Sequence, residues 1–159
     1  MSGLLYIVAV PIGNLNDITF RAVETLKGAE LVLAEDTRHS KKLFDHYEIK
    51  SPLRAFHEHN ENKKVNGIIS EIKSGKSVAL ISDAGTPLIS DPGYKLVSEA
   101  KKTGITVVPI PGPNAAITAL SSSGIASNSF TFFGFLPSKQ TLRIKLLKTK
   151  RNLGETIIF

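Results

Sequence analysis

Cysteine is absent from this chain of 159 residues, and so is any long apolar run. Without cysteine the protein has no disulfide bond, no catalytic thiolate and no zinc site with thiolate ligands. The first apolar run, Leu4 to Val10, follows no basic residue and ends at Pro11. A membrane-spanning helix needs about 18 apolar residues, and a signal peptide needs a basic start and a longer apolar stretch. We therefore expect a soluble, cytoplasmic protein that does not bind a membrane.

Several common catalytic signatures are missing as well. The chain holds no Walker A sequence, and only Gly13 stands for the three glycines of the dinucleotide fingerprint. No set of serine, histidine and aspartate assembles into a hydrolase site. His57 and His59 have the wrong spacing for the zinc motif of metalloprotease helices. We expect a polar surface or a substrate contact at these histidines, and no metal site.

Acidic residues are scarce in the last stretch of the chain. The first 138 residues have 14 basic and 13 acidic side chains, whereas residues 139–159 have six basic ones and a single acid, Glu155. The six basic residues are Lys139, Arg143, Lys145, Lys148, Lys150 and Arg151. Most of the net charge of +6 therefore lies at this end. Such a block can attract a polyanion such as RNA, and the alternative is an ordinary solvated helix face.

Short β-branched runs alternate with amphipathic stretches along the chain. Strands are predicted over residues 4–10, 31–34, 53–56, 78–81 and 106–110. Helices are predicted over residues 17–27, 40–47, 63–73, 94–102 and 114–123, the first of them capped by Asp17. This alternation is typical of right-handed crossovers. The sequence therefore predicts an α/β fold with a mostly parallel five-stranded sheet flanked by helices.

The pattern changes after Gly124. Residues 129–135 alternate threonine with phenylalanine, a basic helix is predicted over about 139–150, and the chain ends in the apolar stretch Thr156–Phe159. Natural termini are usually polar and exposed. We therefore expect a first domain over residues 1–124, and over residues 125–159 the beginning of a second, truncated α/β domain.

Ligands of parallel sheets bind at the carboxyl ends of the strands. Four loops at such ends are unusual in composition: Pro11–Leu15, Glu35–Arg38, Ser82–Gly93 and Pro109–Ala116. The loop Ser82–Gly93 is the most unusual, because it is long and rich in Asp, Gly and Pro, and long irregular loops are usually functional. The loop after the first strand contains Gly13, which permits a close backbone approach. The loop after the second strand contains Asp36, which is placed either to contact a ribose or to cap a helix, with Arg38 in solvent.

The sequence resembles the tetrapyrrole methylase superfamily of S-adenosylmethionine-dependent methyltransferases. The matching stretches follow one another in the expected order along nearly the whole chain: Val10–Leu15 with Asp17–Thr19, Ala34–His39, Phe56–Asn60, Ser82–Gly93, Pro109–Ala116 and Gly134–Pro137. The motifs Asp-Ala-Gly-Thr-Pro and Glu-Asp-Thr-Arg resemble those of the family branch that modifies ribosomal RNA, and they differ from those of the small-molecule methylases. Thr86 stands where many members have aspartate, which favours the same branch.

The resemblance implies a cofactor held between two α/β domains in a homodimer. The residues that it assigns to S-adenosyl-L-methionine are Pro11, Ile12, Gly13, Asp83, Ala84, Gly85, Thr86, Pro87, Ile89, Asn114 and Ala115. The candidates for contact with RNA are Arg38, His57, Lys139 and Arg143. No metal is required.

The reaction implied is methylation of the ribose 2′-hydroxyl of a cytidine in small-subunit ribosomal RNA. The ribose oxygen attacks the methyl carbon, and a neutral thioether leaves. Because an alcohol is a poor nucleophile, a general base is needed, and Asp36 is the first candidate, followed by Glu35. Two alternatives remain open at this point: a small-molecule methylase acting on a tetrapyrrole, and a module that only binds RNA or dimerises.

Overall fold

The computed structural model describes residues 2–151 and 154–159, and this part of the chain forms two compact units. The first unit comprises residues 1–114 and the second residues 115–159. Helix α5 (Ala115–Ser122) is therefore grouped with the second unit. The division into these units reflects contacts within the chain and does not define domains. The domain boundary near residue 124 therefore stays a prediction.

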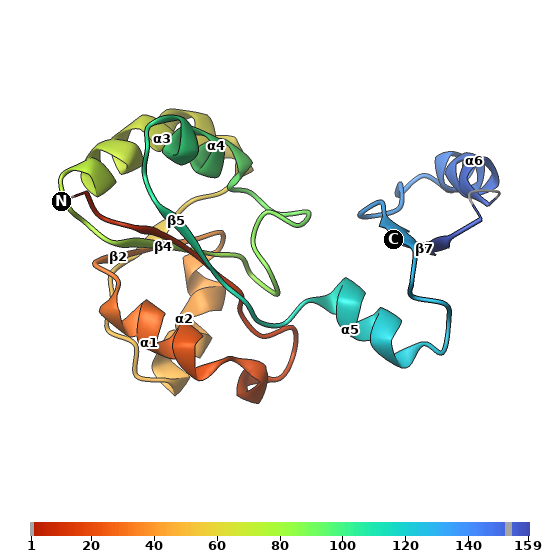
Figure 1. The fold of residues 1–159 in the computed structure, drawn as a ribbon, viewed down its shortest axis with the longest axis horizontal. Coiled ribbons are helices and arrows are strands. Elements are labelled where there is room, and N and C mark those ends of the chain that lie inside the picture. The colour runs from red at the N-terminus through yellow and green to blue at the C-terminus, as the bar shows by residue number, and fades with distance from the viewer. Residues whose placement is uncertain (1, 152–153) are drawn as a thin grey trace. The chain divides into compact units, whose positions relative to one another are not determined.

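The first unit is built around a five-stranded parallel sheet (Figure 1). Its strands lie in the order β3-β2-β4-β1-β5. Their bounds are β1 Leu5–Val8, β2 Leu31–Ala34, β3 Leu53–Ala55, β4 Val78–Ile81 and β5 Val107–Ile110. All neighbouring pairs are parallel, so the predicted α/β class and sheet are confirmed.

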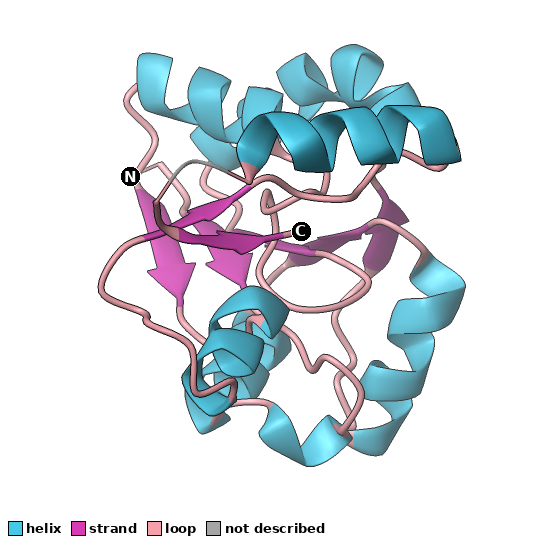
Figure 2. Cartoon of the chain, turned by 90° about the vertical axis from the view of Figure 1, so that its right-hand side faces the viewer, coloured by secondary structure: helices cyan, strands magenta, loops and turns pink. Residues whose placement is uncertain are grey.

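Helices cover both faces of this sheet (Figures 1 and 2). On one face lie α1 (Phe20–Gly28) and α2 (Thr37–His46), and on the other lie α3 (Glu58–Lys73) and α4 (Tyr94–Lys102). No helix in residues 2–151 and 154–159 is both long and apolar enough to cross a membrane.

The beginnings of three helices differ from the prediction, because side chains before the apolar periodicity act as caps. Asp17 ends a short 3₁₀ turn (Leu15–Asp17), and α1 is capped instead by Thr19, whose Oγ1 accepts from the Ala22 N–H at 3.1 Å. Asp36 caps α2, which begins three residues early. Helix α3 begins at Glu58, where the N–H of His57 donates to Asn60 Oδ1 at 3.1 Å.

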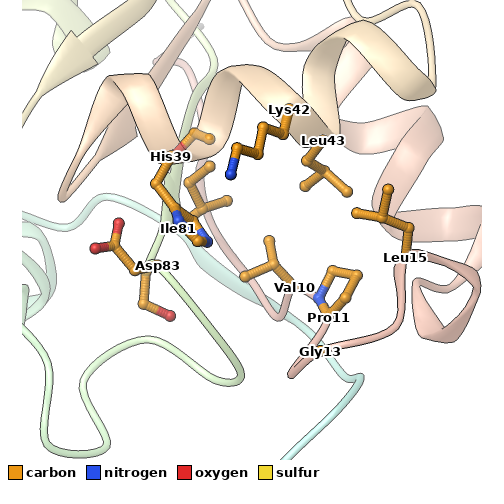
Figure 3. A pocket seen from close by; sticks show the side chains of 11 residues that line it. Val10, Pro11, Gly13, Leu15, His39, Lys42, Leu43, Ile81 and Asp83 are labelled. Atoms are coloured by element: carbon orange, nitrogen blue, oxygen red, sulfur yellow. The ribbon is translucent and has the colours of Figure 1, made fainter.

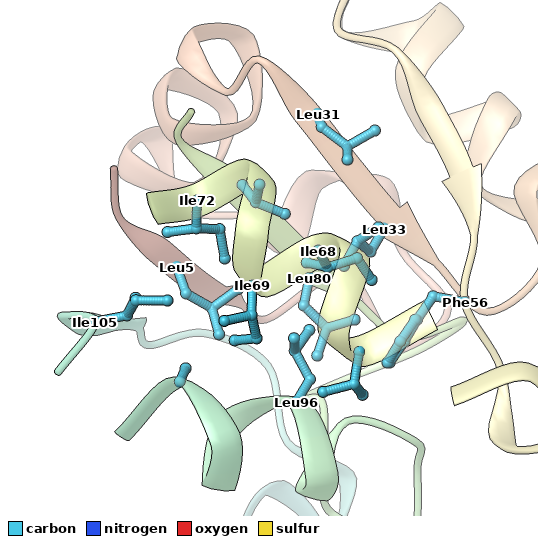
Figure 4. Packing of buried hydrophobic residues seen from close by; sticks show 13 residues of the cluster. Leu5, Leu31, Leu33, Phe56, Ile68, Ile69, Ile72, Leu80, Leu96 and Ile105 are labelled. Carbon is cyan, nitrogen blue, oxygen red and sulfur yellow. The ribbon is translucent and has the colours of Figure 1, made fainter. Parts of the chain in front are cut away.

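Both faces of the sheet are buried, and successive strand residues alternate between them. Leu31 and Leu33 pack toward α3 and α4, whereas Val32 and Ala34 pack toward α1 and α2. Figure 4 shows the first of these clusters, in which α3 contributes Val65, Ile68, Ile69 and Ile72. Burial on both faces is the reason that the strands are apolar without polar alternation.

Helix α4 begins without a capping side chain of its own, because Gly93 occupies its N-cap position. A carboxylate from α3 takes this role. Glu61 is 5% exposed, and its Oε1 accepts from the N–H of Lys95 at 3.0 Å and from that of Leu96 at 3.4 Å. A carboxylate at a helix N-terminus satisfies free amides and interacts favourably with the helix dipole. Glu61 thus joins the two helices on this face.

Replacing Glu61 by alanine is expected to destabilise the first unit by about 1–3 kcal/mol, because buried amides lose their acceptor. Glu61→Gln keeps an acceptor oxygen and is expected to cost less. Urea denaturation followed by circular dichroism measures both. Equal losses in the two variants would show that the carbonyl-type oxygen is not what α4 requires.

The second unit contains α5, β6 (Phe130–Phe132), α6 (Gln140–Lys150) and β7 (Thr156–Ile158). Strands β6 and β7 pair in parallel, with α6 between them in the chain. The Glu155 carboxylate accepts from the hydroxyls of Ser129 and Thr131. Large apolar side chains of this unit are exposed: Ile117, Ile125, Phe130, Phe132, Phe135, Leu142, Ile144 and Leu147.

Candidate active site

The centre of the sheet has the arrangement that creates a ligand crevice in α/β folds. Strands β1 and β4 are neighbours, yet the helices that follow them, α1 and α4, cover opposite faces. The two connections therefore separate above the carboxyl ends of these strands. Ligands of open parallel sheets bind at such a switch point. The loops after β1 and β4 include most of the residues that the resemblance assigns to the cofactor.

These two loops are tied together by backbone pairing. The Val10 N–H donates to the Gly85 carbonyl at 2.9 Å, and the Gly85 N–H donates back to Val10 at 3.0 Å. The pairing is an isolated antiparallel bridge beyond the parallel sheet. Gly85 has φ +74°, and a Cβ there would lie 3.4 Å from Ile12 Cγ2. The backbone of this loop is therefore packed directly on the loop after β1.

The loop after β5 joins the same cluster. The Thr86 hydroxyl donates to the Pro113 carbonyl at 3.2 Å. Asn114 follows Pro113 directly, and Ala115 opens α5 in the second unit. Of the residues assigned to the cofactor, the structure thus brings together those of the first unit, which lie on the loops after β1, β4 and β5. Their assigned role stays a prediction.

Part of the loop after β4 has an unfavourable backbone conformation. Leu88 has φ 71° and Ser90 has φ 66°, values that cost L-amino acids about 1 kcal/mol or more each. Ile89, between them, is exposed. Backbone strain of this kind is concentrated at binding and catalytic sites, because the surrounding structure must maintain it.

Asp36 is engaged in local contacts. Its carboxylate accepts from the N–H of Arg38 at 2.8 Å and forms an ion pair with the Arg38 guanidinium, also at 2.8 Å. The hydrogen bonds from Arg38 hold the pKa of Asp36 well below its usual range. The side chain of Arg38 is 92% exposed and folds back on its own helix start. Asp36 therefore has the geometry of a helix cap, the alternative that the sequence left open.

Glu35 has the opposite electrostatic environment. Burial raises its pKa above the ordinary value, and the charges of Asp83, Asp91 and Glu58 raise it further. Burial and Asp83 also raise the pKa of Asp91. Glu35, Glu58 and Asp91 line one pocket of ≈ 330 Å³, together with Glu61, Ser90, Pro92, Gly93 and Tyr94. A carboxyl with a raised pKa is a stronger proton acceptor, and such groups are frequent at active sites.

Asp83 connects the loop after β4 with the loop after β2, at the carboxyl ends of the strands. Its Oδ1 accepts from the backbone N–H of Asp36 at 3.0 Å, so that the loops after β2 and β4 are joined. Asp83 also lines a second pocket of ≈ 260 Å³ (Figure 3). The other residues around this pocket are Val10, Pro11, Gly13, Leu15, His39, Ser40, Lys42, Leu43, Ile81 and Ser82.

Sequence reasoning missed His39 and Lys42. They are three residues apart and therefore share one face of α2. The predicted helix began at residue 40, so that His39 stood outside it. A helix start at Thr37, indicated by the capping ability of Asp36, would have placed both residues on the same face.

The predicted RNA-contact residues lie in different parts of the chain. His57 precedes α3, and its ring centroid lies 6.0 Å from that of His59. Lys139 and Arg143 are exposed at the beginning of α6 in the second unit. Within the described ranges, no group of three or more His, Cys, Asp or Glu residues could hold a metal ion.

The site and fold are those of an α/β protein with a ligand crevice at the switch point, and comparison with known proteins specifies the class. A sequence profile described as "Tetrapyrrole (Corrin/Porphyrin) Methylases" matches residues 4–159. The chain belongs to the tetrapyrrole methylase family, as its motifs predicted. Methyltransferases of this family use S-adenosyl-L-methionine.

Curated relatives match the whole chain. Ribosomal RNA small subunit methyltransferase I of Haemophilus influenzae is 55% identical over 159 residues, which are 100% of this chain and 56% of the relative. The protein of the same name from Pseudomonas aeruginosa is 52% identical, over 99% of this chain and 56% of the relative. The chain thus spans about half the length of these relatives.

Solved structures support the fold. A diphthine synthase structure superposes with a TM-score of 0.75 at 16% identity, over 98% of this chain and 62% of the other. A uroporphyrin-III-C-methyltransferase from Thermus thermophilus has a TM-score of 0.63 at 24% identity, over 83% of this chain and 60% of the other. At these identities the likeness extends to the fold alone.

Proposed function

We propose that this chain carries the cofactor-binding part of a methyltransferase that acts on the ribose 2′-hydroxyl of a cytidine in small-subunit ribosomal RNA. The carrying observation is the 55% identity to a relative named for that RNA, across the whole chain. The clustering of matched motifs of the first unit at one edge of its sheet supports it. The same fold also occurs in small-molecule methylases. The substrate is therefore determined by the residues of the site and not by the fold.

The residues of the first unit fit a cofactor such as S-adenosyl-L-methionine. When bound, this cofactor supplies a methyl group that is already reactive, so the protein has mainly to bind, orient and exclude water. Gly13 has φ +146°, and a Cβ there would meet nothing within 4 Å, so its backbone is open to a ligand. Gly85 is held by the bridge to Val10 and Thr86 by its hydrogen bond to Pro113, so the loop after β4 is fixed beside the loop after β1.

Glu35 is our candidate for the general base. A ribose hydroxyl must lose its proton as the new oxygen–carbon bond forms, and a carboxylate with a raised pKa accepts that proton more readily. Glu35 has such a pKa, whereas the pKa of Asp36 is lowered by Arg38. The order of the two candidates is therefore reversed from the one that the sequence suggested.

Other parts of the proposal rest on the family resemblance. We propose a homodimer and a cytoplasmic location, where ribosomal RNA is available. Light scattering of the purified protein tests the dimer.

Isothermal titration calorimetry with S-adenosyl-L-methionine tests the cofactor site. We expect measurable heat with a single class of sites. No heat at millimolar cofactor would contradict a formed site in this chain.

The substrate is tested separately, by transfer of a labelled methyl group to small ribosomal subunits from a strain lacking the enzyme. Label in a tetrapyrrole but not in ribosomal RNA would contradict the proposed substrate.

A further inference from the structure

The pocket beside α2 combines an apolar floor with a cationic rim. Val10, Pro11 and Ile81 come from the ends of β1 and β4, and Leu15 and Leu43 complete the apolar part. Figure 3 shows the side chains of His39 and Lys42 directed from α2 toward this space, with Asp83 at its edge. A flat apolar ring that carries an anionic group would find a matching surface here.

Helix α2 concentrates positive charge near the proposed site. Besides Lys42 it carries Arg38 and Lys41, while Asp45 is its one acidic residue. Arg38 is engaged with Asp36. Within residues 2–151 and 154–159, no hydrogen bond or ion pair of Lys42 is found, so its ammonium group is available to a ligand. A lysine that borders an apolar pocket in this way is suited to hold a phosphate.

The opposite side of the same edge repels anions. Glu35, Glu58 and Asp91 line the pocket next to α3 and α4, and like charge contributes to the raised pKa of Glu35. A polyanion that approaches the carboxyl ends of the strands is therefore directed toward α2. Asp83 lies between the two sides, lining the α2 pocket and interacting with Glu35.

We infer that the α2 pocket binds the target nucleotide of the RNA, with its base on the apolar floor and a phosphate held by Lys42 and His39. Pro11, Gly13 and Asp83, which the resemblance assigns to the cofactor, also line this pocket, so the nucleotide would lie directly beside the cofactor. This inference rests on the proposed function. A base can enter such a pocket only when it is not paired with another base, so the target would be presented unpaired. Enzymes that modify nucleotides commonly act on single-stranded or extruded residues. Lys42 and His39 are then positioning residues, which bring the ribose to the carboxylate side of the edge.

The test compares Lys42→Ala with Lys41→Ala. Both variants remove one exposed positive charge from α2, but only Lys42 lines the pocket. Binding is measured by the fluorescence anisotropy of a short labelled oligocytidylate at several salt concentrations. Lys42→Ala is expected to raise the Kd about tenfold and to reduce the slope of log Kd against log salt by about 0.7, the value for one phosphate on a single strand. Lys41→Ala is expected to change the Kd less than about threefold, and Lys42→Arg to retain binding.

Calorimetry with S-adenosyl-L-methionine is run on the same variants and is expected to give unchanged affinity. Equal weakening by Lys41→Ala and Lys42→Ala would overturn the inference, because it would indicate diffuse attraction to the helix. Loss of cofactor affinity in Lys42→Ala would also overturn it, because the pocket would then belong to the cofactor. Neither readout depends on methyl transfer, so failure of the proposed substrate is a separate result.

Discussion

Replacing Glu35 by glutamine is expected to lower the rate of methyl transfer by about 10²–10⁴-fold, the contribution typical of a general base. Folding should not suffer. The pKa of Glu35 is raised in the folded protein, so its carboxylate costs stability once the pH exceeds the ordinary value of 4.5. At neutral pH the glutamine variant is therefore expected to have the same Tm as the wild type or a higher one. Methyl-transfer kinetics and thermal denaturation of the two proteins measure these effects.

Asp36→Asn is the matched control for this substitution. Asparagine caps helices about as well as aspartate, so α2 should keep its start, and the rate is expected to change little. If Asp36→Asn abolished methyl transfer while Glu35→Gln retained it, our assignment of the base would be wrong.

The pH profile gives an independent test through Asp83. Asp83→Asn keeps an acceptor oxygen for the Asp36 N–H but removes a charge that raises the pKa of Glu35. The pKa of Glu35 should therefore fall, and the acid limb of kcat/KM should move to lower pH. A profile that does not move would indicate that a group other than Glu35 sets this limb.

Gly93→Ala is expected to destabilise the first unit by about 2–5 kcal/mol, through backbone strain and overpacking together. Gly93 has φ +126°, which L-amino acids rarely adopt. Its added Cβ would lie 2.6 Å from Leu80 Cδ2 and 3.2 Å from Leu88 Cδ1. Leu80 is buried in the core, so its side chain and that of Leu88 must shift to make room for the added Cβ. Urea denaturation of the variant measures the loss.

The same chemical change at Gly67 is the control and should have the opposite sign. Gly67 is an exposed position inside α3, and a Cβ there would meet nothing within 4 Å. Alanine is therefore expected to stabilise the helix by about 0.5–1 kcal/mol. Leu80→Val shortens the side chain that Gly93→Ala would strike, so the double variant should recover part of the loss. Strict additivity would show that the clash is not the cause.

The fold was largely predictable because both faces of the sheet are covered. Residues 31–34 and 78–81 were predicted with the observed bounds, since each is a short apolar run between turn residues. Residues 94–102 were equally clear, with apolar positions at helical spacing before Gly104. The ends of the other elements were harder to predict. Capping by Thr19 and Asp36 depends on side-chain geometry that apolar periodicity does not reveal.

The loops of the candidate site could be located from the sequence, but the electrostatic environments of its acidic residues could not. Each loop follows a strand and carries unusual residues, so it could be found from the sequence. The opposite pKa shifts of Glu35 and Asp36 could not be predicted, because Glu35 is surrounded by acids that are distant in the chain and Asp36 contacts its own helix start. Lys42 was missed for a similar reason: its neighbours in the pocket include Val10 and Ile81, more than thirty residues away on either side.

The position of β1 between β4 and β5 has a consequence for the order of events during synthesis. Strand β1 is made before both of its neighbours, so it has no partner in this sheet until residues 78–81 have been made, and its second edge stays unpaired until residues 107–110 follow. The Val10–Gly85 bridge joins residues 75 positions apart, so it cannot form until Gly85 has been made. Contacts so distant in the chain form slowly. The edge that carries the candidate site therefore depends on residues that are made late. A nascent chain that ends just before Gly85 contains α1, α2 and α3 but can form neither this bridge nor α4.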